Sequence, residues 1–388
     1  MRKIIAIVLD VMSVGGIPKA CADFVSQLVE YFDVTMVMRS TEGEMMSLLP
    51  ENIQIKTTTH LVFRDITKDM LKKHRYIRFA KFAIPYVFTS RLCNRWVKAN
   101  AMVAKERGIY VDGEYDCVIA YHGMNIGHLV TALYGVNAKK KIAWIHGDHP
   151  FDGIHRQDAE QVYQEFDKIY CVSPVMRERF LADFPKVASI TDSYKNLLTP
   201  ELVNEKANEP ADGIVDDNRI RIVTVGRISK EKGQDIIPLV LKELEGRGIS
   251  AHWYLVGDGD DADRIKSLAK ELMVSDYITF LGAKANPYPY MKECDLYVQP
   301  SYTEGYCLTV CEAAILCKPI VLTAAAAAAG ILENGKNAVV TDASFSSLAD
   351  GIEYLIKHKD LQDLFKTQLK TEDFSNRNEI NKLLEYLR

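Results

Sequence analysis

The feature that most constrains the fold is a repeated unit: a short apolar run, a polar turn and then a helix-forming segment. Its clearest example is the apolar run 296–299, which precedes the turn 300–307 and a helix predicted over 308–317. Short continuous apolar runs indicate strands that are buried on both faces. Because such strands alternate here with helices, the sequence predicts an α/β fold built on parallel sheets.

The unit recurs in two series, separated by a polar, turn-rich connector at 208–218. A chain of 388 residues is long enough for two domains. We expect an N-terminal domain at 1–200, a linker at 201–218, a second domain at 219–372 and a last helix at 373–388 that returns to the first domain. The predicted strands cover 4–9, 34–38, 53–56, 115–121, 141–145 and 169–172 in the first series, and 219–225, 253–256, 278–281, 296–299 and 319–323 in the second.

The first strand leads into two adjacent glycines, Gly15 and Gly16. A helix is predicted over 18–32, with Pro18 at its first position. A strand, a glycine loop and a helix form the first half of a doubly wound unit. The G-x-G-x-x-G fingerprint is absent, which argues against an NAD-dependent oxidoreductase. The glycines either let a ligand approach the backbone or serve only as a tight turn.

Two glutamates flank the start of the predicted 308–317 helix. Glu304 lies in the turn, and Glu312 lies about one turn inside the helix. Free N–H groups and the helix dipole favour an anion such as a diphosphate at this point. At a rise of about 1.5 Å per residue, Glu312 lies roughly 6–7 Å from the free N–H groups, about the separation of a diphosphate from its ribose. The pattern outlines a nucleotide-sugar site, unless the two are an ordinary loop carboxylate and a solvated or capping one.

Two cations leave the turn that follows strand 219–225. This turn begins with Gly226 and contains Arg227 and Lys232. Arginine binds a phosphate through two parallel hydrogen bonds, whereas lysine acts as a point charge. Directed at the start of the 308–317 helix, the pair would neutralise a diphosphate leaving group. The alternative is a solvated basic turn.

Three further loops follow predicted strands. Gly257 ends strand 253–256, and Lys284 lies in the loop after 278–281, where a nucleobase would fit between backbone and side chains. His146 and Asp148 lie in the segment 146–150, at the end of strand 141–145 where parallel sheets place ligands. His146 is suited to hydrogen-bond a substrate hydroxyl and Asp148 to act on an acceptor, unless both are structural.

The segment 56–107 is strongly basic. It carries thirteen Lys and Arg against three acidic residues, a net charge of +10 in a chain whose net charge is −4. Basic residues interleaved with aromatic ones on amphipathic segments suit an anionic membrane surface, where each contributes about 1 kcal/mol. A solvated helix face and a nucleic-acid patch are the alternatives. No nucleic-acid motif accompanies the charge, so we favour the membrane.

The cysteines and the N-terminus bear on the compartment. The eight cysteines show neither a C-x-x-C pair nor metal-ligand spacing, which indicates a reducing environment and no metal site. The apolar run near the N-terminus is too short for a signal peptide, and no stretch approaches the ~20 residues of a membrane span. We expect a cytoplasmic protein, peripheral on the inner face of the membrane. The six alanines at 324–329 indicate no chemistry.

Glu304 and Glu312, with seven residues between them after Pro300 and Ser301, resemble the E-x7-E signature of retaining glycosyltransferases of family 4. The turn from Gly226 to Gly233 is similar to that family's diphosphate-binding turn. The resemblance is strong over 219–323 and weaker over 1–200. It departs from the family at 324–329, where the family has a glycine and acidic loop. Further matching loops contain Gly15, Gly16, His146, Gly147, Asp148, Gly257, Asp258, Gly259 and Gly282.

The resemblance implies a GT-B fold, in which two Rossmann-like domains face each other across a cleft. It implies a UDP- or GDP-sugar donor, no metal, and transfer with retained anomeric configuration to a glycan or glycolipid of bacterial surface-polysaccharide type, such as a capsule. It implies that Arg227 and Lys232 bind the donor diphosphate. Glu304 and His146 would contact the donor sugar, and Glu312 would bind the ribose. Phosphate would be contacted by Gly16 and by the backbone amides near Leu308 and Thr309.

Two other functions fit the same residues. A nucleotide-sugar epimerase of related fold would convert the donor without an acceptor. A non-catalytic nucleotide-sugar-binding protein would bind the donor and release no free nucleotide.

Overall fold

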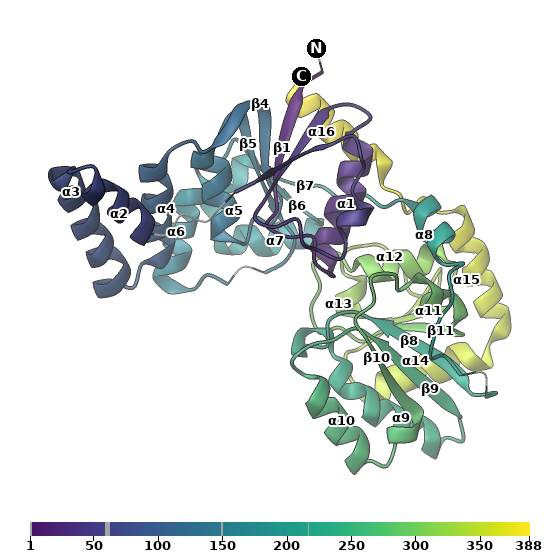
Figure 1. Ribbon diagram of the computed structural model, residues 1–388. Helices are drawn as coiled ribbons and strands as arrows, with labels where there is room; N and C mark the ends of the chain where they lie inside the picture. The colour runs from purple at the N-terminus through teal and green to yellow at the C-terminus, as the bar shows by residue number, and fades with distance from the viewer. Residues whose placement is uncertain (1, 59–62, 149, 216) are drawn as a thin grey trace. The chain divides into compact units, whose positions relative to one another are not determined.

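The computed structural model describes residues 2–58, 63–148, 150–215 and 217–388 (Figure 1). Residues 59–62, 149 and 216 lie outside these ranges. The predictions made for the basic segment 56–107, the segment 146–150 and the connector 208–218 therefore lie partly outside the described residues. The chain divides into two compact units. The N-terminal unit holds residues up to Ser13, Ile17–Lys195 and Asn378–Arg388, and the C-terminal unit holds Val14–Gly16 and Asn196–Arg377.

In its described part, the N-terminal unit contains one parallel sheet of seven strands in the order β3-β2-β1-β4-β5-β6-β7. β1 lies beside both β2 and β4, with Ile5 opposite Val34 on one side and Cys117 on the other. The strands are β1 Ile4–Val8, β2 Asp33–Met38, β3 Gln54–Thr57, β4 Val111–Ala120, β5 Val136–Ile145, β6 Lys168–Cys171 and β7 Thr191–Ser193.

Helices flank this sheet, and α2 and α3 lie at the outer edge of the unit, away from the strands (Figure 1). Two π-helical turns, Phe88–Leu92 and Thr131–Gly135, extend α3 and α5. The helices are α1 Gly16–Leu28, α2 Phe63–Lys72, α3 Tyr76–Val87, α4 Trp96–Arg107, α5 Ile126–Val130, α6 Gly153–Tyr163, α7 Pro174–Asp183 and α16 Ile380–Leu387.

The C-terminal unit is built on a second parallel sheet, with six strands among its described residues in the order β10-β9-β8-β11-β12-β13. The chain therefore moves outward from β8 in one direction and from β11 in the other. The strands are β8 Ile220–Val225, β9 Ala251–Val256, β10 Ile278–Gly282, β11 Leu296–Gln299, β12 Ile320–Thr323 and β13 Val339–Thr341.

Both faces of the second sheet are buried, because alternate residues of each strand enter different clusters. Ile222, Trp253 and Leu296 pack with α9, α10 and α14. Their neighbours Val223 and Tyr254 pack on the opposite face with α8, α11 and α12. The helices are α8 Pro200–Lys206, α9 Ile237–Gly246, α10 Ala262–Glu271, α11 Tyr288–Glu293, α12 Leu308–Ile315, α13 Ala324–Ala327, α14 Phe345–Lys357 and α15 Lys359–Thr371. The predicted α/β class with two parallel-sheet, Rossmann-like domains is confirmed.

The structure corrects one local prediction and adds detail at two other segments. α1 begins at Gly16, so Pro18 is not its first residue. A proline is tolerated there because the first N–H groups of a helix have no acceptor within it. The expected linker 201–218 contains most of α8. The alanine run is helical over Ala324–Ala327, and the Thr323 hydroxyl accepts a hydrogen bond from the Ala326 N–H, in keeping with the high helix propensity of alanine.

The last helix, α16, belongs to the N-terminal unit. The carbonyl oxygens of Tyr386 and Leu387 at its end accept hydrogen bonds from the ammonium groups of Lys140 and Lys3. Cations at a helix C-terminus satisfy carbonyls that have no partner within the helix and oppose the helix dipole. The C-terminal end of the chain is thereby held against the first sheet.

Candidate active site

The candidate site in the C-terminal unit lies where the order of strands reverses, between β8 and β11. Ligands of open α/β sheets bind at the carboxyl ends of the strands at such a switch point. Strand β8 ends at Val225 and strand β11 at Gln299. The turn after β8 carries Lys232 and the turn after β11 carries Glu304. The two turns lie side by side because β8 and β11 are neighbours in the sheet.

Lys232 and Glu304 are in direct contact. The Lys232 ammonium donates to both carboxylate oxygens of Glu304, at 2.8 Å each. The Glu304 side chain is 7% exposed and that of Lys232 is 27% exposed. Burial acts to lower the pKa of Lys232, but the Glu304 carboxylate outweighs it, so the pKa lies above its ordinary value. Lys232 is therefore a positive charge at neutral pH.

The two turns are also joined through their backbones. The N–H groups of Tyr302 and Thr303 donate to the Glu231 carbonyl, at 2.9 and 3.3 Å. Gly233 has a φ of 66°, and a Cβ placed there would lie 2.0 Å from the Pro300 carbonyl oxygen. Only glycine fits this close approach, because any other residue would bring a Cβ into contact with the backbone.

Glu304 also accepts a hydrogen bond from a chain of buried polar side chains. The Ser301 hydroxyl donates to Glu304 Oε1 at 2.7 Å, and Gln299 Nε2 donates to Ser301 Oγ at 2.9 Å. Gln299 Oε1 accepts from the hydroxyls of Tyr297 and Thr309, at 2.7 and 3.3 Å. We did not single out Gln299 or Ser301 as functional from the sequence. The available signal was a glutamine that ends an otherwise apolar strand.

α12 begins at Leu308, as predicted. Its N-cap residue, Cys307, is in the left-handed conformation and its side chain makes no capping hydrogen bond. Among the described residues, none accepts a hydrogen bond from the N–H groups of Leu308 or Thr309. These groups are available to an anion, and the helix dipole adds to the attraction.

Glu312 is buried in α12 at 3% exposure. The Tyr288 hydroxyl of α11 donates to Glu312 Oε1 at 3.0 Å. Tyr288 was missed by sequence reasoning, and no local pattern distinguishes it from other buried tyrosines. The structure thus places the two glutamates in different hydrogen-bonded surroundings, Glu304 with Lys232 and Ser301, and Glu312 with Tyr288.

The other predicted residues of this unit surround the two turns. Arg227 is exposed, and its guanidinium forms no ion pair with a described residue. Gly226 and Gly257 lie back to back, since a Cβ on Gly257 would be 1.9 Å from the Gly226 carbonyl oxygen. Gly257 therefore serves the packing of two strand ends against each other. Lys284 lies over the ring of Tyr290, with its ammonium 5.7 Å from the ring centre.

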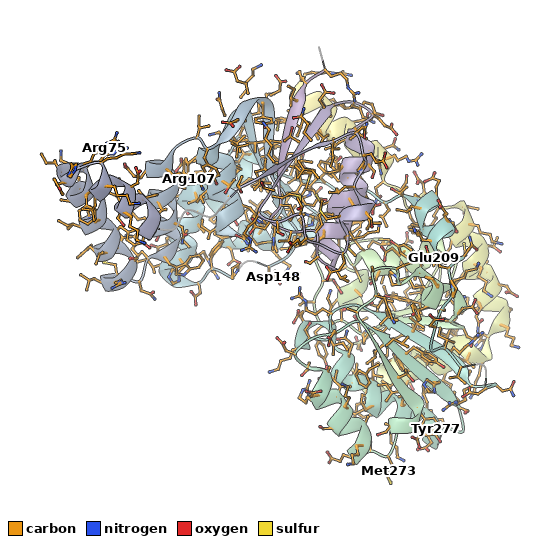
Figure 2. The ribbon with its side chains drawn as sticks, in the orientation of Figure 1. Arg75, Arg107, Asp148, Glu209, Met273 and Tyr277 are labelled. Carbon is orange, nitrogen blue, oxygen red and sulfur yellow. The ribbon has the colours of Figure 1, made fainter. Side chains whose placement is uncertain are left out.

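The predicted residues of the N-terminal unit lie at the ends of its strands. His146 follows β5, and its ring lies 4.7 Å from that of Tyr121. Burial lowers the pKa of His146 to about 3, so the ring is neutral. Asp148 forms an ion pair with Arg179 and is labelled in Figure 2. Gly15, which precedes α1, and Gly16, which opens it, belong instead to the C-terminal unit.

This first sheet has its own switch point, between β1 and β4. Asp10 and His128 meet there, and the Asp10 N–H donates to His128 Nε2 at 3.2 Å. His128 is buried at 2% exposure. Neither residue was identified from the sequence, because α5, which carries His128, is far from Asp10 along the chain.

A second candidate surface is the helical hairpin α2–α3 with the π-helical turn that follows it, which we call the basic hairpin (residues 66–92). Its tip carries Arg75, whose side chain projects from the end of the hairpin in Figure 2. Its exposed apolar side chains are Leu71, Tyr76, Ile77, Ile84, Val87, Phe88 and Leu92, with Ile77 and Leu92 at 76% and 74% exposure. Its exposed basic side chains are Lys68, Lys72, Lys73, Arg75, Arg78, Lys81 and Arg91.

The described ranges, 2–58, 63–148, 150–215 and 217–388, hold neither a metal-binding cluster nor a membrane-spanning helix. No group of three or more His, Cys, Asp or Glu side chains in these ranges is arranged to hold a metal ion. None of the helices described is both long and apolar enough to cross a bilayer.

Comparison with known proteins gives the class of the enzyme. Residues 205–371 match the family described as Glycosyl transferases group 1. An uncharacterized glycosyltransferase of Haemophilus influenzae is 24% identical over 292 residues, which cover 74% of this chain and 78% of that protein. The N-acetylgalactosamine-N,N'-diacetylbacillosaminyl-diphospho-undecaprenol 4-alpha-N-acetylgalactosaminyltransferase of Campylobacter jejuni is 24% identical over 152 residues, which cover 39% of this chain and 41% of that protein.

The fold is similar to that of solved glycosyltransferase structures. HepE of Anabaena, crystallised with UDP-glucose, superposes with a TM-score of 0.72 at 17% identity, and the superposition covers 99% of each chain. Residues 205–371 are therefore similar to a glycosyl transferases group 1 domain, and the chain is a glycosyltransferase with the GT-B fold of two Rossmann-like domains.

Proposed function

We propose that this enzyme transfers a sugar from a UDP- or GDP-sugar to a lipid-linked glycan acceptor, with retention of the anomeric configuration. The observation that carries the proposal is the contact between Lys232 and Glu304 at the β8–β11 switch point, where a cation and a carboxylate are held side by side. The cation would neutralise charge on a diphosphate, and the carboxylate would accept hydrogen bonds from the hydroxyls of a sugar. The complex of HepE with UDP-glucose supports a nucleotide-sugar donor.

Each side chain has a role that follows from its surroundings. Arg227, exposed and without an ion pair to a described residue, binds the diphosphate together with Lys232 and the open N–H groups at the start of α12. Glu304 accepts hydrogen bonds from the donor sugar. Glu312, oriented by Tyr288, accepts them from the ribose. The loop of Lys284 holds the base, and Gly16, which belongs to the same unit, approaches the diphosphate.

The reaction breaks the bond between the anomeric carbon and the leaving phosphate oxygen, and it forms a bond from that carbon to an acceptor hydroxyl oxygen. Both events take place on one face of the sugar. The leaving phosphate oxygen accepts the proton of the acceptor hydroxyl, so no separate base is required. Arg227 and Lys232 stabilise the negative charge that develops on the diphosphate. We propose that this charge stabilisation proceeds without a metal ion.

The basic hairpin supports a lipid-linked acceptor. Residues 77, 81, 84 and 88 recur at helical spacing and so share one face of the hairpin. On this face Ile77, Ile84 and Phe88 are exposed apolar side chains, and Lys81 lies among them as a basic one. An apolar stripe with basic neighbours suits insertion into the headgroup region of an anionic membrane. The relative from Campylobacter jejuni, whose name includes a diphospho-undecaprenol acceptor, supports such a substrate.

The donor is tested by a thermal-shift panel of UDP-glucose, UDP-N-acetylglucosamine, GDP-mannose and their free nucleotides, because a ligand that binds the native state raises its melting temperature. The donor that binds is then incubated with the enzyme, with and without an acceptor extract. Release of nucleotide only with acceptor, and an NMR coupling constant that shows the donor's anomeric configuration in the product, support the proposal. Conversion of donor alone indicates an epimerase, and binding without turnover indicates a sensor.

The membrane surface is tested by co-sedimentation with phosphatidylglycerol vesicles at low and high salt. The double variant Ile77→Ser/Ile84→Ser is expected to lose most of the bound fraction. The matched control is Met273→Ser in the C-terminal unit, because Met273 is as exposed as Ile77, at 76%. Equal binding by the double variant and the wild type would refute a role for the hairpin.

A further inference from the structure

The carboxylate of Glu304 has a second support besides Lys232. All three members of the supporting chain are buried: Tyr297 at 0%, Gln299 at 1% and Ser301 at 0% exposure. Each hydrogen bond in it runs toward Glu304. Tyr297 donates to Gln299, Gln299 donates to Ser301, and Ser301 donates to Glu304.

The direction of this chain is determined by its chemistry. A serine hydroxyl has one hydrogen, and the Ser301 hydrogen is directed at Glu304 Oε1. The amide NH2 of Gln299 can only donate, and its oxygen already accepts from Tyr297 and Thr309. Ser301 therefore presents a donor, and not an acceptor, to the carboxylate. Hydrogen bonds to a charged carboxylate are stronger than those between neutral groups.

The two supports differ in what a donor substrate does to them. Under the proposed function, Lys232 is drawn toward the diphosphate, and its hydrogen bonds to Glu304 are weakened or lost. Ser301 is fully buried and carries no charge, so the diphosphate exerts no comparable pull on it. The Ser301 hydroxyl therefore continues to orient the carboxylate toward the sugar.

We infer that Ser301, supported by Gln299, is a positioning residue that holds the Glu304 carboxylate in place for the donor sugar while Lys232 binds the diphosphate. This inference rests on the proposed function. It makes Ser301 specific for the sugar part of the donor, because the nucleotide part is bound by other residues.

The test compares affinities for a nucleotide sugar and for its free nucleoside diphosphate, measured by calorimetry on the full chain. The probes are UDP-glucose with UDP and GDP-mannose with GDP, and the pair that binds the wild type is used. Ser301→Ala is expected to weaken binding of the nucleotide sugar about tenfold or more while leaving that of the free nucleotide unchanged, since one hydrogen bond to a charged group is lost.

The matched control is Thr224→Val. Thr224 is also buried, at 1% exposure, and its hydroxyl donates to the Val298 carbonyl at 2.6 Å, away from Glu304. This variant is expected to lose thermal stability but to keep the wild-type ratio of the two affinities. A merely structural role for Ser301 would make the two variants behave alike. If Ser301→Ala does not fold, Gln299→Met removes the donor to Ser301 and is expected to shift the ratio in the same direction.

The outcomes separate the two hypotheses. Equal weakening of both ligands by Ser301→Ala, or of neither, overturns the positioning role while the proposed function stands. Failure of every probe to bind the wild type refutes the proposed function, and the inference falls with it. If Ser301→Ala selectively weakens binding of the nucleotide sugar and Thr224→Val does not, the result supports both the positioning role and the proposed function.

Discussion

The contact between Lys232 and Glu304 predicts a measurable coupling of their side chains. Replacing Lys232 with Met leaves the Glu304 carboxylate, which is 7% exposed, without its cation. Breaking a fully buried ion pair costs about 3–5 kcal/mol, and breaking an exposed one costs about 0–1 kcal/mol. Lys232 is partly exposed and the Ser301 bond remains, so we expect Lys232→Met to cost about 2 kcal/mol of local stability.

A double-mutant cycle isolates the coupling. The variants are Lys232→Met, Glu304→Gln and the double variant, and the measurement is hydrogen exchange followed by mass spectrometry of peptides from β8 and β11. This readout reports opening of the C-terminal unit even where the two units unfold separately. Each single variant is expected to speed exchange by up to about 30-fold, and the double variant by less than the product of the two.

The coupling also has an expected pH dependence. The pKa of Lys232 is raised in the folded protein, so the stabilisation is fully present below the unfolded-state value of about 10.4 and is lost only as pH rises through the higher folded-state value. The coupling is therefore expected to be the same at about pH 6 and about pH 9. Effects of the two single variants that simply add would refute the contact. In activity assays, Lys232→Met is expected to abolish turnover nearly completely.

Three further predictions follow from single positions. Gly233→Ala places a Cβ 2.0 Å from the Pro300 carbonyl oxygen, so the variant is expected to melt at a clearly lower temperature and to lose donor binding; wild-type melting would contradict the close approach. Tyr288→Phe removes the hydrogen bond to Glu312 and is expected to weaken binding of the free nucleotide about tenfold by calorimetry, with unchanged circular dichroism; unchanged affinity would exclude Tyr288 as the residue that orients Glu312. Because the pKa of His146 is lowered in the folded protein, the unfolded state binds more protons between about pH 3 and its own histidine pKa of about 6.5, and stability is lost as pH falls through this window. Thermal melts over the same window should show a smaller loss of stability for His146→Gln than for the wild type.

The sequence by itself determined the class of fold. Apolar runs too short for helices alternate with helical segments, and chains with this pattern bury their strands between two layers of helices. Most strand positions were predicted to within a few residues because burial on both faces leaves a continuous apolar run, but β5 begins five residues earlier than predicted, and the short strands β7 and β13 were not predicted. The start of α12 at Leu308 was predicted for the same local reason, a turn followed by helix-forming residues.

The tertiary structure decided which polar groups meet. Lys232 and Glu304 are 72 residues apart, and only the adjacency of β8 and β11 brings them within hydrogen-bond distance. Ser301 and Tyr288 became identifiable for the same reason, because a buried hydroxyl is distinguished by the partner it meets and not by its neighbours along the chain. Local pattern encodes burial and periodicity, whereas strand order is set by the packing of the whole sheet.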